Sequence, residues 1–295
     1  MAERRGDQAA GLRRLFAARR SVQFVSFVAG SVGVGRSTLL ANLATCLARR
    51  GKEVLLVDEN SGDDLLAYFG RQASCDLLQA IDGQKAIDDV LVGVAPGVRV
   101  LPAALLVRQL ARLAAGEQQR LIDCLRAMTP AADVVLIDTS LDHPLGFSPL
   151  GLATRETIIV VSTSGQSITE AYALIKRVSL GYARRSFRIL VTKARTADEA
   201  QAIHANMARL THSRRIAQIE YAGHVPNDEH LRLAARLCQP VTALFPEAPA
   251  AKASHCLAAS LLDWQNDDEV AGGMDDFVQQ LVHLSQRIEP IAIYA

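Results

Sequence analysis

The stretch that decides the fold is residues 22–38, which read VQFVSFVAGSVGVGRST. The first half, 22–28, is mostly apolar and rich in valine and phenylalanine, which is typical of a buried strand. The second half, 30–38, fits the pattern G-x-x-x-x-G-K-[ST] at every fixed position except the lysine, where Arg36 stands. Glycines between a strand and a helix let backbone N–H groups converge on phosphate oxygens at the positive end of the helix dipole. The stretch therefore predicts a phosphate-binding loop at a strand-to-helix junction.

Short apolar runs of the same kind follow along the chain and alternate with helical patterns. Directly after the loop, apolar residues recur at helical spacing over 40–47, and Gly51 marks the end of that helix. Such an alternation predicts the α/β class, with a single doubly wound, mostly parallel sheet and helices on both faces. Residues 240–254, with three prolines, read as a loop before a last helix over 255–264. The predicted strands are 22–28, 54–58, 98–101, 134–138, 157–162 and 187–192.

Composition narrows the class of protein further. The chain has 295 residues and 49% hydrophobic content, which is enough for a large core and excludes a disordered or fibrous chain. The net charge is +1, so no overall basic field favours nucleic acid, although the first 20 residues hold six arginines. We expect a domain over 21–265 between an N-terminal segment, 1–20, and a C-terminal tail, 266–295.

The five cysteines are scattered, without the spacing of a metal site or a disulfide framework. No apolar run reaches the roughly 18 residues that span a bilayer, and we find no secretory signal pattern. These features favour the cytoplasm.

Acidic residues that end two predicted strands are candidate metal ligands. Ser37 would be the hydroxyl ligand of Mg²⁺, and Asp138, which ends 134–138, with Asp58, which ends 54–58, would complete the shell. A simpler alternative is a glycine-rich turn that only joins a strand to a helix.

The loop resembles that of the MinD/ParA-type ATPases, whose deviant form is K-G-G-x-G-K-[ST]. Both lysines are missing, because Ser31 and Arg36 stand in their places. In that family the first lysine reaches the partner's phosphates in an ATP-bound dimer, and the second binds phosphate in its own subunit. Arg36 offers a planar fork where a compact ammonium is expected. The resemblance implies ATP and Mg²⁺ as cofactors, held by Gly30, Ser31, Val32, Gly33, Val34, Gly35, Arg36, Ser37 and Thr38.

The family's switch segment D-x-D reads Asp58-Glu59-Asn60 here. The second aspartate helps to position the attacking water, and an amide lacks its negative charge. Asn60 and Asp138 are thus the catalytic candidates, and we expect hydrolysis to be slow or absent. Residues 139–144 replace the family's small, glycine-containing second switch, and His143 within them reads as an ordinary loop residue.

The resemblance is less close in the segments that border the adenine base in that family. Thr192 stands where the family has an asparagine that reads adenine. Residues 222–228 resemble the next segment, G-x-[IV]-P-x-D, whose loop borders the base. The resemblance implies base-binding roles for Thr192, Pro226 and Asp228.

Residues 163–176, TSGQSITEAYALIK, resemble the segment T-x-E-P-x-S-I-T-D-A-Y-A-L-I-K of the FlhG/FleN regulators of flagellar number. Physically, this is a loop capped by Thr169 that opens a helix with Ala171, Leu174 and Ile175 at core spacing. A packing helix without further function is the alternative.

Residues 7–13, DQAAGLR, resemble the D-Q-A-x-x-L-R element with which FlhG proteins engage and stimulate the GTPase FlhF. The resemblance implies an FlhF-like, SRP-type GTPase as partner, with Asp7 and Gln8 in stimulation and Leu12 and Arg13 as anchors. A frayed basic tail that attracts RNA or phospholipid is the alternative.

Residues 275–288 place apolar side chains largely on one helical face, like the membrane-binding helix of MinD and FlhG proteins. The polar face has Asp275, Asp276 and only one cation, Arg287, so attraction to anionic lipid is weak. Packing on the chain's own domain or on a partner is an equal alternative. The apolar positions are Phe277, Val278, Leu281, Val282, Leu284 and Ile288.

Together these features predict an FlhG-like regulator of flagellar number and placement that binds ATP and acts through partners. Those partners include flagellar basal-body or transcription-regulator proteins, an ATP-dependent second copy of the chain, and weakly the inner membrane. Two alternatives stay open: an active ParA/MinD-type ATPase that positions DNA or another cargo, and an interaction module that takes no nucleotide.

Overall fold

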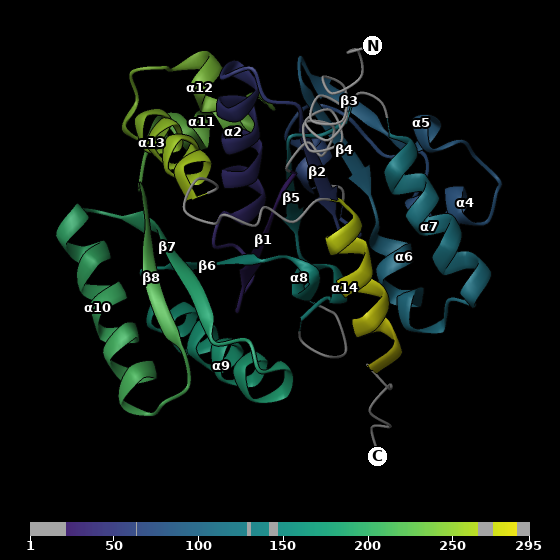
Figure 1. Ribbon diagram of the computed structural model, residues 1–295. Coiled ribbons are helices and arrows are strands. Elements are labelled where there is room, and N and C mark those ends of the chain that lie inside the picture. The colour runs from purple at the N-terminus through teal and green to yellow at the C-terminus, as the bar shows by residue number, and fades with distance from the viewer. Residues whose placement is uncertain (1–21, 63, 129–130, 142–146, 265–273, 288–295) are drawn as a thin grey trace, which may run out of the picture.

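The computed structural model describes residues 22–62, 64–128, 131–141, 147–264 and 274–287 (Figure 1). An eight-stranded sheet runs through this part of the chain in the order β3-β4-β2-β5-β1-β6-β7-β8. Every described pairing is parallel except that of β3 with β4, so the predicted doubly wound, mostly parallel sheet is confirmed. The strands are β1 Gln23–Ala29, β2 Val54–Asp58, β3 Val92–Ala95, β4 Val98–Pro102, β5 Val134–Asp138, β6 Glu156–Ser162, β7 Ser186–Ala194 and β8 Gln218–Pro226.

Helices cover both faces of the sheet (Figure 1). One face packs against α2, α3, α11, α12 and α13, and the other packs against the remaining helices. The helices are α2 Arg36–Arg49, α3 Asp64–Ala67, α4 Leu77–Ile81, α5 Ile87–Val90, α6 Ala104–Gln109, η1 Leu110–Arg112, α7 Ala115–Ala127, α8 Pro149–Ala153, α9 Gly165–Tyr182, α10 Ala197–Ser213, α11 Glu229–Arg236, α12 Val241–Leu244, α13 Pro249–Trp264 and α14 Met274–Arg287.

The central strands have no solvent-facing side, which explains their sequence. In β2 all five residues are buried, with Leu56 in the core of one face and Leu55 and Val57 in the core of the other. Successive side chains of a strand point to opposite faces, so a strand covered on both sides reads as a continuous apolar run.

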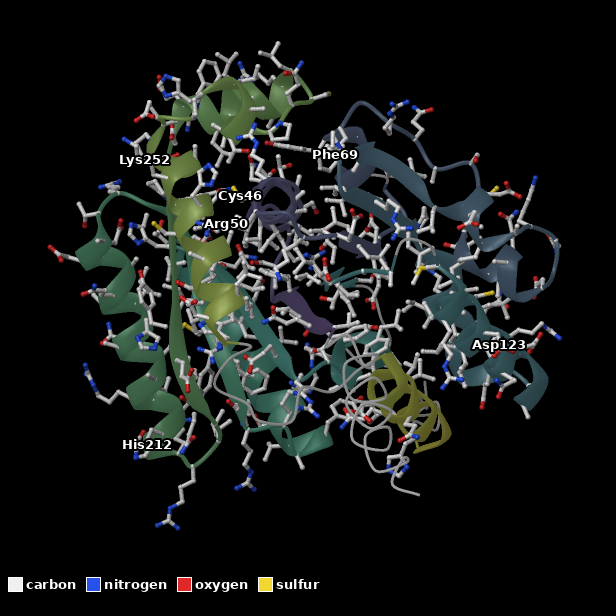
Figure 2. The ribbon with its side chains drawn as sticks, turned by 45° about the horizontal axis from the view of Figure 1, so that its top comes forward. Cys46, Arg50, Phe69, Asp123, His212 and Lys252 are labelled. Atoms are coloured by element: carbon white, nitrogen blue, oxygen red, sulfur yellow. The ribbon has the colours of Figure 1, made fainter. Side chains whose placement is uncertain are left out.

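Helix α2 lies across one face, beside α13 (Figure 2). The predicted helical run over 40–47 lies within it, and Leu40, Leu43 and Leu47 are fully buried. At its end, a guanidinium N–H of Arg50 donates to the carbonyl of His255 over 3.2 Å, which joins the two helices. This side of the core therefore holds the helix that follows the glycine loop in a fixed place.

The sheet topology places the loop at a switch point. Strand β1 lies between β5 and β6, so the chain runs to one side of β1 for β2 to β5 and to the other side for β6 to β8. In open α/β sheets, ligands bind at the carboxyl ends of the strands where the strand order reverses. The glycine loop follows β1 at that place.

Two strands and two helical segments depart from the sequence predictions. β3 and β8 were not predicted, because β3 is a short antiparallel edge strand and β8 is only partly buried. The predicted loop over 240–254 is wrong, since α12 and the first turns of α13 lie within it. Pro240 is the N-cap of α12 and Pro249 is the first residue of α13, positions where a missing N–H has no cost.

The C-terminal helix α14 packs on the chain's own domain. Phe277 stacks on Phe24 of β1, with ring centroids 4.2 Å apart, and Val278 and Leu281 are buried beside them. Helix α14 also contacts α8, α7 and η1, and Figure 1 shows it beside α8. Of the two alternatives for this helix, the structure has the intramolecular one. Three parts of the predicted tail lie outside the described residues: the side chain of Val282, the whole of Ile288, and the boundary between 265 and 266.

Helices long and apolar enough to cross a membrane are absent from the described ranges.

Candidate functional site

The loop between β1 and α2 takes its shape from two glycines in the left-handed region. Gly33 has φ 72° and Gly35 has φ 88°. A Cβ at either position would meet no other atom within 4 Å, so backbone conformation rather than space calls for glycine here. Gly35 is also the N-cap of α2 and gives that helix no side-chain cap. The first amides of α2 therefore lack the capping oxygen that usually satisfies one of them.

The end of β7 holds the loop from one side. The hydroxyl of Thr192 donates to the carbonyl of Val34 over 2.7 Å, and Nζ of Lys193 donates to the carbonyl of Gly33 over 2.6 Å. In a trans peptide the N–H points opposite to the carbonyl. The N–H groups of Gly35 and Val34 therefore face away from β7. This arrangement is typical of an anion-binding turn.

Gly30 lets the loop approach α9. A Cβ at Gly30 would lie 2.4 Å from the carbonyl carbon of Glu170 and 2.6 Å from the nitrogen of Ala171. The segment 163–176 thus packs its backbone directly against the loop. Ala171, Leu174 and Ile175 are buried as predicted, but the cap is Ser164, whose hydroxyl accepts from the N–H of Ser167. The prediction that Thr169 caps the helix is wrong, since Thr169 lies inside it and bonds to the Gly165 carbonyl.

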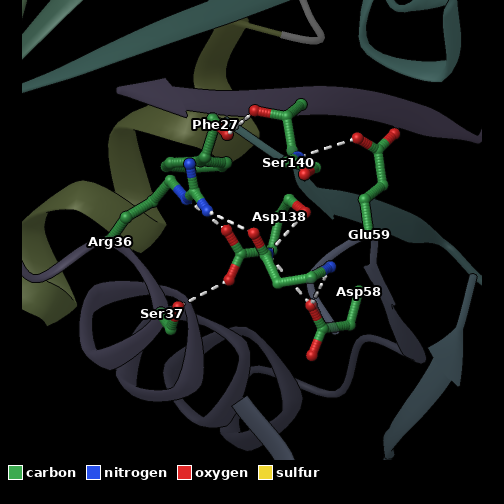
Figure 3. Close-up of polar contacts among 9 residues, drawn as sticks. Phe27, Arg36, Ser37, Asp58, Glu59, Asp138 and Ser140 are labelled. Atoms are coloured by element: carbon green, nitrogen blue, oxygen red, sulfur yellow. Dashed lines mark hydrogen bonds and ion pairs between the residues drawn. The ribbon is translucent and has the colours of Figure 1, made fainter. Parts of the chain in front are cut away.

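Strand register brings the two candidate aspartates together beside the loop. Asp58 of β2 and Asp138 of β5 are direct partners in the parallel ladder. Figure 3 shows Arg36 and Ser37, the first residues of α2, meeting the carboxylate of Asp138. The Arg36 Nε donates to Oδ1, and the Ser37 hydroxyl donates to Oδ2 over 2.7 Å. The ion pair is enclosed, with Asp138 fully buried and the Arg36 side chain 9% exposed.

Asn60 connects the remaining polar groups of the site. Its Oδ1 accepts from Nη2 of Arg36 over 3.1 Å. Its backbone N–H and its Nδ2 both donate to Oδ1 of Asp58 over 3.0 Å, and Nδ2 also lies 3.2 Å from the Asp138 carbonyl. The predicted residues Arg36, Ser37, Asp58, Asn60 and Asp138 therefore form one hydrogen-bonded cluster.

Two neighbouring acids, Asp58 of this cluster and Glu59 next to it in the chain, hold their protons more tightly than usual. Burial, and then the charge of Asp138, raise the pKa of Asp58 to about 7. Burial also raises the pKa of Glu59 to about 7, against the opposing effect of donors from Ser148 and Ser140. The hydroxyl of Ser148 donates to Oε1 of Glu59, and the N–H of Ser140 donates to Oε2 over 2.9 Å. Desolvation destabilises the charged form of each group.

The geometry fits a phosphate. Nη1 of Arg36 is buried and has no hydrogen-bond partner among the described residues. A buried guanidinium N–H without an acceptor is unfavourable, and an anionic oxygen would satisfy it. The nearby first turn of α2 adds the positive end of a helix dipole.

The predicted magnesium ligands have other partners in this structure. Both carboxylate oxygens of Asp138 accept hydrogen bonds, and Oδ1 of Asp58 accepts two from Asn60. Within the described ranges, no three His, Cys, Asp or Glu side chains are grouped to hold a metal ion. This set of donors and acceptors therefore does not fit a bound Mg²⁺ as it stands.

The residues predicted for the adenine end are placed differently. Thr192 is 4% exposed, and its hydroxyl contacts the carbonyls of Val34 and Val161. The carboxylate of Asp228 accepts from the N–H groups of His230 and Ala250 and so caps α11. Pro226 ends β8. A base-binding role for these three residues stays a prediction.

Several predicted residues lie outside the described part of the chain. They are the partner-binding candidates Asp7, Gln8, Leu12 and Arg13, and His143 of the second switch.

Three residues of the site were missed from the sequence: Lys193, Glu59 and Ser148. A signal for Ser148 existed, because a serine followed by proline is typical of a helix N-cap and first turn. Lys193 and Glu59 carry no such pattern.

Comparison with known proteins agrees with this geometry. Residues 25–241 match the CobQ/CobB/MinD/ParA nucleotide binding domain. The chain is 30% identical over 265 residues to the antiactivator FleN of Pseudomonas aeruginosa, covering 88% of this chain and 94% of FleN. It is 25% identical over 157 residues to the flagellum site-determining protein YlxH of Helicobacter pylori, covering 53% of each.

Among solved structures, the septum site-determining protein MinD of Pyrococcus horikoshii, complexed with Mg-ADP, superimposes with a TM-score of 0.61 at 19% identity. That match covers 85% of this chain and 98% of MinD, and it shows a shared fold. The chain belongs to the CobQ/CobB/MinD/ParA family of nucleotide-binding proteins and, within it, is a homologue of FleN.

Proposed function

We propose that this protein is an FleN/FlhG-like regulator of flagellar number and placement that binds ATP at a degenerate phosphate loop. It acts by changing partners and hydrolyses ATP slowly or not at all. The similarity to FleN over most of both chains, and the similarity to the flagellum site-determining protein YlxH, support a function in flagellar regulation. The observation that carries the biochemical part is the buried ion pair of Arg36 with Asp138.

The cluster around Arg36 supports binding better than turnover. Asn60 stands where the family resemblance calls for a water-positioning carboxylate, and its amide is already bonded to Arg36 and Asp58. An amide accepts a proton far less readily than a carboxylate. When bound, ATP would supply the anionic phosphates that Nη1 of Arg36 and the first amides of α2 attract. The chain's own residues hold and orient those phosphates.

Steady-state ATPase activity tests this proposal. With an FlhF-like GTPase and lipid vesicles present, we expect turnover close to the background of a protein-free sample. Robust turnover that disappears on Arg36→Ala would contradict the proposal. The double substitution Ser31→Lys with Arg36→Lys restores both family lysines, and we expect it to raise ATP affinity in calorimetry.

For the partner, we propose an FlhF-like, SRP-type GTPase bound through residues 1–20, with Gln8 and Asp7 in stimulation and Leu12 and Arg13 as anchors. The motif DQAAGLR supports this assignment. A pull-down of the GTPase should succeed with the full chain and fail with residues 1–20 removed or with Gln8→Ala. Gln201→Ala, at an exposed glutamine of α10, is the matched control and should retain the partner.

Other partners in this proposal are flagellar basal-body or transcription-regulator proteins and an ATP-dependent second copy of the chain. We further propose that the protein works in the cytoplasm, with weak peripheral association at the inner membrane through residues 275–288. Docking of α14 on its own domain keeps Phe277, Val278 and Leu281 away from lipid in this conformation. Vesicle flotation with and without ATP tests the membrane part, and flotation that does not change on removal of 275–288 would contradict it.

A further inference from the structure

The carboxylate of Asp138 is fully enclosed, and a side chain of the loop itself neutralises it. Nε of Arg36 donates to Oδ1, and the Ser37 hydroxyl donates to Oδ2 over 2.7 Å. A buried carboxylate is stable only when a cation or several donors compensate its lost hydration. Here the cation is covalently part of α2, so it is present whether or not any ion is supplied from solution.

A guanidinium and a divalent cation compete for the same oxygen. Magnesium requires near-octahedral oxygen ligands at short distances, whereas Arg36 presents N–H donors to Asp138. Arg36 would therefore have to leave Asp138 before a metal ion could bind this carboxylate directly.

The third nitrogen of Arg36, Nη1, lacks a hydrogen-bond acceptor within the described ranges. Nε is bonded to Asp138 and Nη2 to Asn60, but Nη1 has no partner among the described residues although the side chain is only 9% exposed. Arg36 is the first residue of the 14-residue helix α2, directly after an N-cap that supplies no capping oxygen. An anion at this helix end would meet both the unpartnered N–H of Arg36 and the backbone amides.

We propose that Arg36 takes the place of the divalent cation at this site, holding Asp138 with Nε and the terminal phosphate of a nucleoside di- or triphosphate with Nη1. The loop then binds its nucleotide without magnesium. This inference rests on the proposed function, because it needs a nucleotide at the loop. It concerns how the phosphate is held.

Calorimetry of the full chain with ADP, in excess EDTA and in excess magnesium, tests the proposal. ADP is the better probe because it holds magnesium less tightly than ATP. We expect dissociation constants that agree within about threefold between the two buffers, which is a difference of about 0.7 kcal/mol or less. As a second readout, Mn²⁺ replaces Mg²⁺, and electron paramagnetic resonance should find no more bound Mn²⁺ than ADP alone binds.

Two matched substitutions on α2 sharpen the result. Arg36→Lys brings a compact ammonium and frees an oxygen of Asp138, so we expect ADP to bind at least about tenfold tighter in magnesium than in EDTA. Arg49→Lys makes the same change at the other end of α2, where Arg49 donates to the Thr242 carbonyl. It should behave like the unsubstituted chain in both buffers.

The outcomes separate the two proposals. If the unsubstituted chain binds ADP only in magnesium, Arg36 does not replace the cation, and the nucleotide-binding function stands. If no heat is measured in either buffer, both proposals are overturned. The comparison of buffers on the unsubstituted chain decides the inference even if Arg36→Lys fails to fold.

Discussion

Gly30 is the residue at which the loop and α9 approach most closely. The substitution Gly30→Ala places a methyl group 2.4 Å from the Glu170 carbonyl carbon and 2.6 Å from the Ala171 nitrogen. Backbone cannot rotate aside as a side chain can, so the loop or α9 must move. We expect a loss of about 1–3 kcal/mol in the free energy of unfolding, together with weaker ADP binding. Urea unfolding and calorimetry measure the two effects.

Gly181→Ala, in the same helix α9, is the control for this substitution. A Cβ there meets nothing within 4 Å, and alanine is the better helix former by up to about 1 kcal/mol. We therefore expect unchanged or slightly raised stability. Equal losses at the two positions would show that the contact of Gly30 with α9 has no special importance.

Glu59 makes stability depend on pH. Its pKa in the folded protein is about 7, against an ordinary value of 4.5, because burial disfavours the carboxylate. Between these two values the unfolded chain gives up a proton that the folded chain keeps, so the free energy of unfolding falls as pH rises from about 4.5 to about 7. Asp58 contributes in the same direction. At lower pH both folded and unfolded chains are protonated, and the penalty vanishes.

Glu59→Gln isolates this contribution, because glutamine stays neutral. Its carbonyl can accept from the Ser140 N–H and its amide can donate to Ser148. Relative to the unsubstituted chain, we expect the variant to gain stability on going from pH 5 to pH 8, by an amount on the order of 2 kcal/mol. Urea titrations of both proteins at both pH values give the difference in their free energies of unfolding. The contribution of Asp58 is common to both proteins and cancels from this difference. A constant difference across this range would show that Glu59 ionises as it does in water.

At the scale of elements, α14 closes the apolar face formed by β1, α7 and α8. Phe277 stacks almost parallel on Phe24, with an interplanar angle of 7°, and Val278 and Leu281 continue the same face. Phe277→Ala removes the ring from this layer. Large-to-small changes of this kind cost about 3–5 kcal/mol when the site cannot collapse. We expect the loss to appear first as faster hydrogen exchange of the α14 amides, since the helix can detach while the sheet stays folded.

The exposed Gln280 of α14 provides the control. Gln280→Ala changes a side chain that touches solvent, so stability should stay within about 0.5 kcal/mol and exchange within α14 should be unchanged. Faster exchange throughout the sheet in Phe277→Ala would instead mean that α14 and the domain unfold as one unit.

At the scale of the whole molecule, the sequence predicts the layers but not the contacts between them. The central strands and the glycine loop are visible because continuous apolar runs and a strand–loop–helix order are local patterns. β8 escapes because its sequence, QIEYAGHVP, mixes polar and apolar residues on a partly exposed strand. The ion pair of Arg36 with Asp138 depends on the register of β2, β5 and β1, and the tight fit of Gly30 depends on α9, 140 residues away. Such features arise only from tertiary packing.

Cys46 reports on opening of the whole molecule. It lies on α2 (Figure 2), is fully buried in the core that α2 shares with α12 and α13, and burial raises its pKa to about 11. The thiolate is the reactive form, so the folded protein protects Cys46 both by exclusion of reagent and by protonation. Cys238 and Cys256 are exposed. At pH 8, iodoacetamide should modify these two quickly and Cys46 only in molecules that have unfolded.

A ligand at the loop should slow the modification of Cys46, because Cys46 reacts only in unfolded molecules and a bound ligand makes those molecules rarer. A ligand that binds only the folded state lowers the unfolded population by the factor 1 + [L]/Kd. With ADP at about 100 times its dissociation constant, we expect Cys46 to be modified about 100-fold more slowly, as read by mass spectrometry. Cys256 serves as the internal control, and its rate should not change. Slowing at Cys256 as well would point to scavenging of the reagent, whereas no slowing at Cys46 would mean that α2 opens locally without releasing the nucleotide.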